Sequence, residues 1–258
     1  MLSNLAYIHT AAQLGENVTV DPFAVIHEDT IIGDNTHIHS HAVIMPGARI
    51  GNNCKIFSGA IIASAPQDLK FLGEKTTAEI GDNTTIREFA TINRGTKDKM
   101  RTVIGKNVLV MAYVHIAHDC IIGNNVILAN AVNIAGHVVV GDYAVIGGLA
   151  GVHQFVHVGK HSMISGGSLV GKDVPPFSMA ARNPLTYMGL NTTGLKRRNF
   201  SVETINHIAS IYKIVYNGSP TIQAALQKVE EDITPSYYKD EIINFIKHAN
   251  RGIIKPAI

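Results

Sequence analysis

Tryptophan is absent from the 258 residues, and cysteine occurs only twice, at Cys54 and Cys120. Two cysteines cannot form the disulfide framework on which small secreted proteins depend, so the composition favours a reducing compartment. No apolar run approaches the roughly 18 residues of a membrane-spanning helix. The first residues, MLSNLAYIHTAAQLGENV, lack the basic and apolar regions of a signal peptide. We therefore expect a soluble, cytoplasmic protein with no membrane span.

Charged side chains are also scarce. They make up 16% of the chain, against a usual fraction of about 25%. The formal net charge is +2, so the sequence gives no sign of a basic surface for nucleic acid or for an anionic membrane. We expect no nucleic-acid partner.

A repeat of six residues runs through most of the sequence. Steps of six from Ile104 to Val170 meet twelve consecutive aliphatic residues, and the same phase holds from Ile8 to Ile62. At a hydrophobic content of 46%, such a run arises by chance about once in ten thousand trials. A second column, four residues after the first, holds small residues and both cysteines. We interpret the cysteines as buried core thiols rather than nucleophiles.

Glycines recur at multiples of 18 residues, and most are followed by Asn or Asp: Gly15, Gly33, Gly51, Gly105, Gly123, Gly141 and Gly159. We expect corners with positive φ at these places. Three hexads then make one coil, which predicts an all-β solenoid, a parallel β-helix of hexapeptide repeats over residues 1–175. About nine coils, at about 4.8 Å each, would give a prism about 43 Å long.

Two segments, 63–79 and 93–103, interrupt the repeat. Loops that leave a rigid scaffold often carry binding residues. We expect Arg94, Lys97 and Arg101 on the second loop to cover the site or to face an acidic partner protein.

The repeat stops after Val170, and residues 176–258 are predicted to form a connecting segment and a small α-helical domain. The stretch that follows the last hexad, up to about residue 200, carries no periodic signal. Helix boundaries are indicated by Ser201 as an N-cap, Gly218 as a stop, Pro220 in a first turn and Gly252 as a final stop.

Stacking at 18 residues brings histidines together at one corner. The column that begins at His118 continues with Gly136 and Gln154, and four histidines converge on these coils: His115, His118, His137 and His153. Asp119 follows His118 directly and could orient an imidazole that acts as a base. The Gly136 amide is a candidate oxyanion donor.

Two other interpretations of the histidines stay open. Three histidines on neighbouring coils can bind zinc, as in a carbonic-anhydrase-type enzyme, although these do not lie at one height and no cysteine or spare carboxylate completes the set. The chain could also be a non-catalytic scaffold, but the charged interruptions and the KRR triplet argue against that. The segment HIHSH, with His37, His39 and His41, has no partner cluster on adjacent coils, so we interpret it as surface.

Several motifs carry a resemblance to a known family. HIAHDC, AGHVVVGD, IGG, VHQF, DVPPF and GLKRRNF occur in this order, with QDLK upstream. The whole chain resembles the acyl-[acyl-carrier-protein]–UDP-N-acetylglucosamine O-acyltransferases of lipid A biosynthesis. The resemblance implies a left-handed β-helix, a homotrimer with sites between subunits, and transfer of an (R)-3-hydroxyacyl chain from acyl carrier protein to the 3-hydroxyl of UDP-N-acetylglucosamine. It implies no metal and no cofactor beyond the carrier's phosphopantetheine. A 3-amino acceptor sugar stays open.

The resemblance also implies roles for individual residues. His118 is the general base, Asp119 orients it, and the Gly136 amide holds the thioester oxyanion. Contacts to the substrates fall to Asp68, Lys70, His115, His137, His153, Gln154, Asn191 and Arg197. Gly166 is the acyl-chain ruler, and its lack of a side chain implies a long acyl chain of about 14 carbons or more, because each buried CH₂ adds about 0.8 kcal/mol only where space exists.

Overall fold

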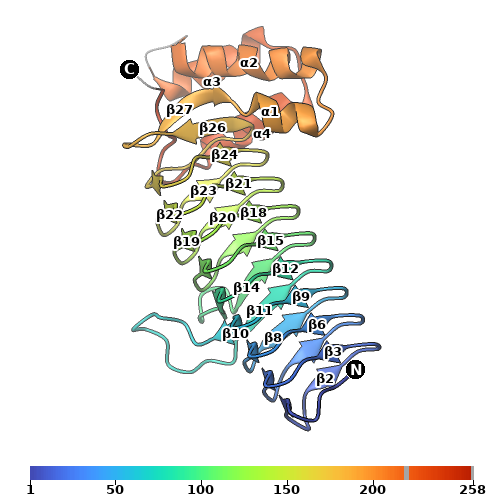
Figure 1. Cartoon of the computed structure of the whole chain (residues 1–258). Helices are drawn as coiled ribbons and strands as arrows, with labels where there is room; N and C mark the ends of the chain where they lie inside the picture. Colours follow the sequence, from blue (N-terminus) through green and yellow to red (C-terminus); the bar gives the residue numbers. More distant parts are fainter. Residues whose placement is uncertain (218–220, 257–258) are drawn as a thin grey trace.

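The computed structural model describes residues 1–217 and 221–256, and it shows a long triangular prism with helices at one end (Figure 1). Strands of two to four residues follow one another around three faces. The first sheet has, within the described residues, nine strands in the order β1 (Tyr7–Ile8), β4 (Val25–Ile26), β7 (Val43–Ile44), β10 (Ile61–Ser64), β13 (Thr91–Asn93), β16 (His115–Ile116), β19 (Asn133–Ile134), β22 (Gly151–Val152) and β25 (Leu169–Val170). The predicted number of coils is thereby confirmed.

The other two faces continue each coil. The second sheet contains β2 (Gln13–Leu14), β5 (Ile31–Ile32), β8 (Ala48–Ile50), β11 (Thr77–Ile80), β14 (Arg101–Ile104), β17 (Ile121–Ile122), β20 (Val139–Val140) and β23 (His157–Val158). The third contains β3 (Thr19–Val20), β6 (His37–Ile38), β9 (Lys55–Ile56), β12 (Thr85–Ile86), β15 (Leu109–Val110), β18 (Ile127–Leu128), β21 (Val145–Ile146) and β24 (Met163–Ile164), followed by β26 (Ser178–Ala181) and β27 (Thr186–Leu190). We call the turns from the first sheet to the second the first corner, those from the second to the third the second corner, and those from the third to the first the third corner.

The register of the sheets follows the predicted 18-residue coil. His115 pairs with Asn133, and Asn133 pairs with Gly151. Across the two interruptions Ile61 pairs with Thr91, and Thr91 pairs with His115. Both loops therefore lengthen a coil by whole hexads and leave the inward phase of the repeat unchanged.

The core is the column of aliphatic residues that the hexads predict. Ile26, Ile44 and Ile62 are fully buried, and the small column packs beside them. Both cysteines are buried and free, as expected. Burial raises the pKa of the Cys120 thiol to about 12, so this group stays protonated and unreactive.

The glycine corners need one correction. The recurring glycines do not have positive φ. Positive φ occurs instead two residues after the glycine, as at Asn35 (φ 55°), which follows Gly33, and at Asn53 (φ 55°), which follows Gly51. A Cβ on Gly33 would lie 2.5 Å from Asn52 Oδ1 and 2.6 Å from the Gly51 carbonyl carbon. These glycines are therefore required because successive coils approach closely, while Asn supplies the left-handed turn.

The stretch expected to be irregular contains two strands. β26 pairs in parallel with β24, and β27 returns antiparallel to β26. This hairpin covers the last edge of the third sheet, where backbone groups would otherwise lack partners. The hexad period does not reveal it because the second strand runs in the opposite direction.

Four helices follow: α1 (Thr192–Arg197), α2 (Val202–Asn217), α3 (Ile222–Asp232) and α4 (Tyr237–Lys247). They sit at the end of the prism that carries β24 (Figure 1). The Ser201 hydroxyl accepts a hydrogen bond from the Thr204 N–H at 3.1 Å, so the expected N-cap is confirmed. None of the helices in the described residues is long and apolar enough to cross a bilayer.

One predicted helix boundary differs from the structure, and two others cannot be compared with it. Gly218 and Pro220 lie outside the described residues. The last helix ends at Lys247 with His248 as its C-cap, so the prediction that Gly252 ends it is wrong. Gly252 instead supplies a positive φ of 65° in the turn that leads the chain back to the prism.

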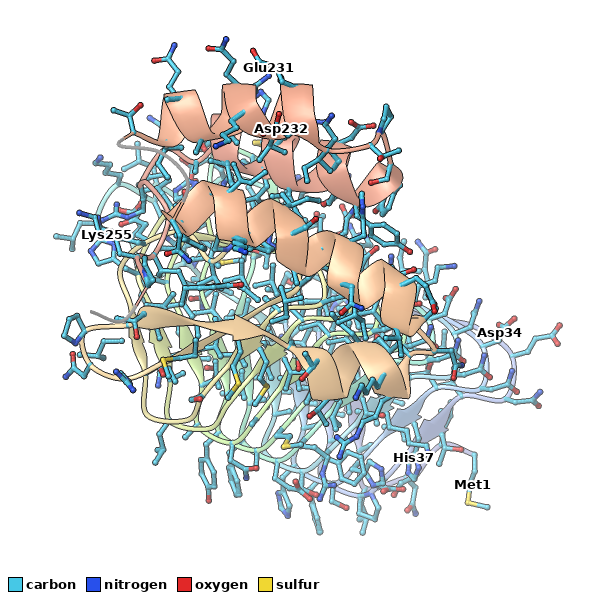
Figure 2. All side chains as sticks on the ribbon, turned by 90° about the horizontal axis from the view of Figure 1, so that it is seen from above. Met1, Asp34, His37, Glu231, Asp232 and Lys255 are labelled. Carbon is cyan, nitrogen blue, oxygen red and sulfur yellow. The ribbon has the colours of Figure 1, made fainter. Side chains whose placement is uncertain are left out.

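Buried polar and aromatic groups form the contacts between the helices and the prism. The Tyr212 hydroxyl donates to the Pro176 carbonyl at 2.5 Å. The buried Asp173 carboxylate accepts hydrogen bonds from the N–H groups of His157 at 2.7 Å and Arg251 at 3.2 Å. Figure 2 shows the prism from the helical end, with side chains filling its centre and projecting from its corners.

His161 lies where the prism meets the helices, at the second corner. Its ring stacks on Tyr143 at a centroid distance of 4.7 Å and on Phe177 at 5.6 Å, and Phe200 meets it edge-on at 5.1 Å. Burial, followed by the positive charge of Arg198, lowers the pKa of His161 to about 4.

Acid should therefore weaken the protein through this histidine. Between about pH 6.5 and pH 4 the unfolded chain binds a proton at this position that the folded chain does not, so stability falls as pH falls. Urea unfolding across this range should show a shallower loss for His161→Phe than for the original chain. Equal slopes in both proteins would contradict the assignment, since His39, His115 and His137 would then carry the whole effect.

Candidate active site

The candidate site occupies the first corner, where strands of the first sheet turn into the second. His118 and Asp119 lie between β16 and β17, His137 lies between β19 and β20, and His153 lies between β22 and β23. Both interruptions of the repeat leave from the same corner, between β10 and β11 and between β13 and β14. The fold thus gathers the histidines and the two irregular loops at one edge of the prism.

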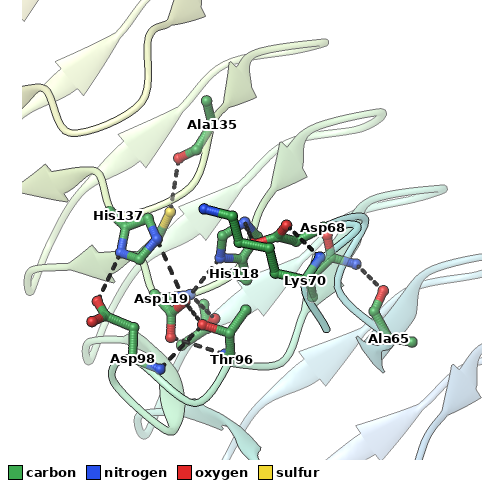
Figure 3. A network of polar contacts seen from close by, with 12 residues as sticks. Ala65, Asp68, Lys70, Thr96, Asp98, His118, Asp119, Ala135 and His137 are labelled. Carbon is green, nitrogen blue, oxygen red and sulfur yellow. Dashed lines mark hydrogen bonds and ion pairs between the residues drawn. The ribbon is translucent and has the colours of Figure 1, made fainter. Parts of the chain in front are cut away.

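His118 and Asp119 form a buried pair (Figure 3). His118 Nδ1 lies 2.8 Å from Asp119 Oδ2, and the two residues are 7% and 0% exposed. The Thr96 N–H donates to Asp119 Oδ1 at 2.9 Å and its hydroxyl to Oδ2 at 2.6 Å. Burial alone would raise the pKa of Asp119, but the hydrogen bonds from Thr96 and His118 more than offset it and the pKa is lowered.

The charge of Asp119 decides which imidazole nitrogen is free. An ionised carboxylate only accepts hydrogen bonds, so Nδ1 of His118 carries the proton and Nε2 keeps its lone pair. Nε2 faces the first loop, with Asp68 Oδ2 at 4.0 Å. The arrangement presents a base at Nε2.

Gly136 lies directly against this imidazole. A Cβ at residue 136 would be 2.7 Å from His118 Cε1 and 2.8 Å from Nε2, so only glycine leaves the ring in place. Within the described residues the Gly136 N–H donates to no acceptor. A free backbone donor therefore lies next to a free base, which is the pairing that acyl transfer requires.

A groove of about 670 Å³ extends from His118 along the outer face of the first sheet. Gln67, Asn93 and His115 line its polar part, and Gly151, Leu169 and Val170 line its apolar part. The groove crosses the coils at right angles to the strands. It has the shape to hold an extended apolar chain beside the base.

The remaining histidines of the corner differ in environment. His115 Nδ1 lies 2.8 Å from the Thr91 hydroxyl, and burial followed by the neighbouring His118 lowers its pKa. His137 Nδ1 lies 3.3 Å from Asp98 Oδ2; burial lowers its pKa, although the charge of Asp119 opposes this. His153 is exposed, and its Nδ1 lies 3.1 Å from the carbonyl oxygen of Gln154, which follows it in the chain.

Comparison with known proteins agrees with this geometry. Residues 173–254 match the family model described as UDP N-acetylglucosamine O-acyltransferase, domain 2, and residues 11–46, 29–64 and 101–136 match the bacterial transferase hexapeptide model. The acyl-[acyl-carrier-protein]–UDP-N-acetylglucosamine O-acyltransferase of Sulfurihydrogenibium sp. is 58% identical, over 98% of this chain and 93% of the relative. That of Chlorobaculum tepidum is 57% identical, over 97% and 96%.

A solved structure extends the likeness to three dimensions. The UDP-N-acetylglucosamine acyltransferase of Bacteroides fragilis superposes with a TM-score of 0.97 at 48% identity, covering 99% of this chain and 100% of that one. The chain belongs to the acyl-[acyl-carrier-protein]–UDP-N-acetylglucosamine O-acyltransferase family. It is an acyltransferase of the first step of lipid A biosynthesis, and its fold is a left-handed parallel β-helix with a small C-terminal helical region.

The other interpretations of the histidines are not supported by these relatives, which are all O-acyltransferases. The structure also changes the set that zinc would need. His118, Asp119 and His137 converge, while His153 does not join them. Asp119 is a carboxylate close enough to complete this set, contrary to the sequence-based expectation that none is available. Its two oxygens, however, already accept hydrogen bonds from Thr96.

Three residues that the family resemblance implied are not brought to His118 by a single chain. Asn191 caps α1: its Oδ1 accepts from the Gly194 N–H at 3.1 Å, and its Nδ2 donates to the His161 carbonyl at 2.9 Å. Arg197 is exposed at the end of the same helix, which packs on the second corner. Gly166 is exposed at the third corner, between β24 and β25.

The loop residues divide into two groups around His118 (Figure 3). Asp68 and Lys70 lie on one side, where Asp68 Oδ1 accepts from the Lys70 N–H at 2.9 Å. Thr96 and Asp98, which the sequence did not single out, lie on the other. A polar Gly-Thr turn at the start of an interruption is the only signal that could have indicated Thr96.

Two of the three basic side chains of the second loop make contacts within the chain, although all three were expected to cover the site or face a partner. Arg94 donates to the Pro46 carbonyl at 3.1 Å and lies over the Phe71 ring. Arg101 pairs with Glu79 at 3.6 Å. Lys97 is exposed, and no ion pair is found for it within the described residues. It is therefore the residue of the three that can face a partner protein.

Replacing Thr96 with valine tests the buried network. The variant loses the hydroxyl bond to Asp119, so the pKa of Asp119 should rise and the orientation of His118 should loosen. A hydrogen bond to a charged group is worth about 1.5–3 kcal/mol, which corresponds to a loss of about tenfold or more in kcat/KM. The acidic limb of the pH profile should move to higher pH.

Thr84→Val is the matched control for this experiment. Thr84 is also buried, and its hydroxyl donates to the Gly105 carbonyl at 2.9 Å, away from the site. It should lose stability but keep its pH profile. If both variants show the same profile, Thr96 acts only through the fold.

Proposed function

We propose that this chain transfers an (R)-3-hydroxyacyl group from acyl carrier protein to the 3-hydroxyl of UDP-N-acetylglucosamine, with His118 as the general base. The observation that carries the assignment is the free Nε2 of His118 beside the free N–H of Gly136, at the head of the groove. The names of the relatives supply the two substrates.

The reaction balances with these groups alone. His118 Nε2 accepts the proton of the sugar hydroxyl as its oxygen attacks the thioester carbonyl, and Asp119 stabilises the imidazolium. The Gly136 N–H donates to the oxyanion of the tetrahedral intermediate. When the intermediate collapses, the C–S bond breaks and the imidazolium returns the proton to the departing thiolate of phosphopantetheine. No step needs a metal or a further cofactor.

The substrates are assigned by the chemistry of the corner. Asp68, Lys70, His137, His153 and Gln154 offer polar groups around Nε2 for the sugar nucleotide. His115, which lines the polar part of the groove, offers a further contact for the sugar nucleotide. The apolar part of the groove then takes the rest of the acyl chain. The two free, buried cysteines are consistent with a cytoplasmic location.

Acyl transfer from a panel of 3-hydroxyacyl carrier proteins to UDP-N-acetylglucosamine tests this function directly. His118→Ala should keep the fold and lose about 10²–10⁴ in kcat. A folded variant with near-normal turnover would remove His118 as the base. Transfer to a 3-amino sugar but not to the 3-hydroxyl would remove the proposed acceptor.

We also propose that the working form is a homotrimer with shared sites. Arg197 lies at the second corner and His118 at the first, so one chain cannot supply both to one substrate. A three-fold assembly of prisms sets the second corner of one chain against the first corner of the next. Asn191 would then act by holding α1 in place.

Mixing two inactive variants tests the shared site. His118→Ala and Arg197→Ala homo-oligomers should each be impaired, and co-expression should restore part of the activity because some sites receive both original residues. Sedimentation should give three chains per particle. No restored activity, or an active monomer, would contradict the proposal.

Gly166 is proposed as the residue that limits acyl-chain length, again through a neighbouring chain. A Cβ at residue 166 would lie 3.0 Å from the Gly148 carbonyl oxygen, so a side chain requires a shift of a few tenths of an ångström there, while the backbone has no positive φ that would strain it. The original chain should prefer donors of about 14 carbons or more, and Gly166→Met should prefer shorter ones with activity retained. An unchanged profile, or an original preference for ten-carbon donors, would place the ruler elsewhere.

A further inference from the structure

A second group of ligand-type side chains lies far along the prism from the catalytic corner. His37 belongs to β6, His39 follows that strand, and Asp21 follows β3 on the preceding coil. His37 Nε2 is 3.0 Å from Asp21 Oδ2, and His39 Nδ1 is 3.3 Å from the same oxygen. The segment was expected to have no partner cluster on adjacent coils, and its partner in the structure is a single residue, Asp21. Asp21 was missed because it stands alone in its coil.

The spacing of these three atoms is that of a metal site. Zinc bonds to nitrogen and oxygen are about 2.0–2.1 Å long, so the ligand atoms of a tetrahedral site lie about 3.3 Å apart. The pairs measured here are 3.0 and 3.3 Å, and all three donor atoms fall within 4.8 Å of one another. Two imidazoles and one carboxylate form a donor set that zinc and cobalt(II) accept.

An ion pair alone does not account for the orientation of His37. Its Nε2 is shielded from solvent, yet it makes no hydrogen bond to any described group, although Asp21 Oδ2 is close. The nitrogen and the oxygen thus approach each other without the alignment of a hydrogen bond. A cation held between them would satisfy both.

Packing holds the rings in this arrangement. His37 and His39 stack at a centroid distance of 3.8 Å, and His39 stacks on Phe57 at 4.4 Å. The side chains are about one-quarter to one-third exposed, so the group lies close to the surface.

We propose that Asp21, His37 and His39 bind one divalent transition-metal ion of the zinc class per chain. Three protein ligands leave a fourth position for water or another small ligand. His37 belongs to β6, which lies toward the N-terminal end of the prism, opposite to the helices (Figure 1). The site is built on strands and coil corners, and it is independent of the acyl-transfer reaction.

Cobalt(II) is the probe, because four-coordinate cobalt gives visible absorption bands. The His118→Ala chain is titrated first, so that the group formed by His118, Asp119 and His137 does not contribute. One equivalent should bind, and excess zinc should displace it. Asp21→Asn, His37→Ala and His39→Gln, each added to this background, should weaken binding at least tenfold.

His41→Ala is the matched control. His41 belongs to the same HIHSH segment but stacks on Phe23 and takes no part in the group. It should bind cobalt as the parent does, and Asp21→Asn in the original chain should keep full acyltransferase activity. The proposal fails if no cobalt binds at 100-fold excess, if the three ligand variants bind normally, or if His41→Ala loses binding equally.

Discussion

The backbone hydrogen bonds between coils, repeated every 18 residues, are the constraint on which the rest of this protein depends. They leave so little room at the corners that a Cβ on Gly33 would meet the next coil. The same repeat fixes which side chains become neighbours, since in the regular coils residue i lies beside residue i+18. The first corner contains one such column. His118 and Gly136 are in contact there because the 18-residue register places them side by side on adjacent coils.

The two loops add what a regular coil cannot provide. A bare corner would leave the Asp119 carboxylate buried with one imidazole as its partner, and an unpaired buried charge is costly. The second loop brings the Thr96 N–H and hydroxyl to that carboxylate and keeps it ionised. The first loop brings Asp68 to the open side of His118. Because both insertions are whole hexads, the core beneath them is undisturbed.

The features that depend on the six-residue period can be predicted from the sequence, and the features that do not depend on it are missed. The coils, the buried cysteines and the alignment of His118 with Gly136 and Gln154 all follow from counting. β26 and β27 were missed because an antiparallel hairpin has no hexad phase, and Thr96 and Asp21 because their partners lie on other coils without a motif. The glycine corners show a subtler failure: the spacing was right, but it reflects close packing of coils, and Asn35 rather than Gly33 takes the positive φ.

The three corners of a single prism look alike, but the residues that we propose to act on the substrates are divided among them. His118 lies at the first corner, the basic helix α1 at the second, and Gly166 at the third. A monomer keeps these groups on separate edges, with the sheets and the core between them. The proposed trimer would bring these groups together without any change in fold, because a rotation axis parallel to the prism sets unlike corners of adjacent chains face to face. The regularity that makes the scaffold rigid therefore also keeps these groups apart within one chain, and this separation is the basis for the shared site that we propose.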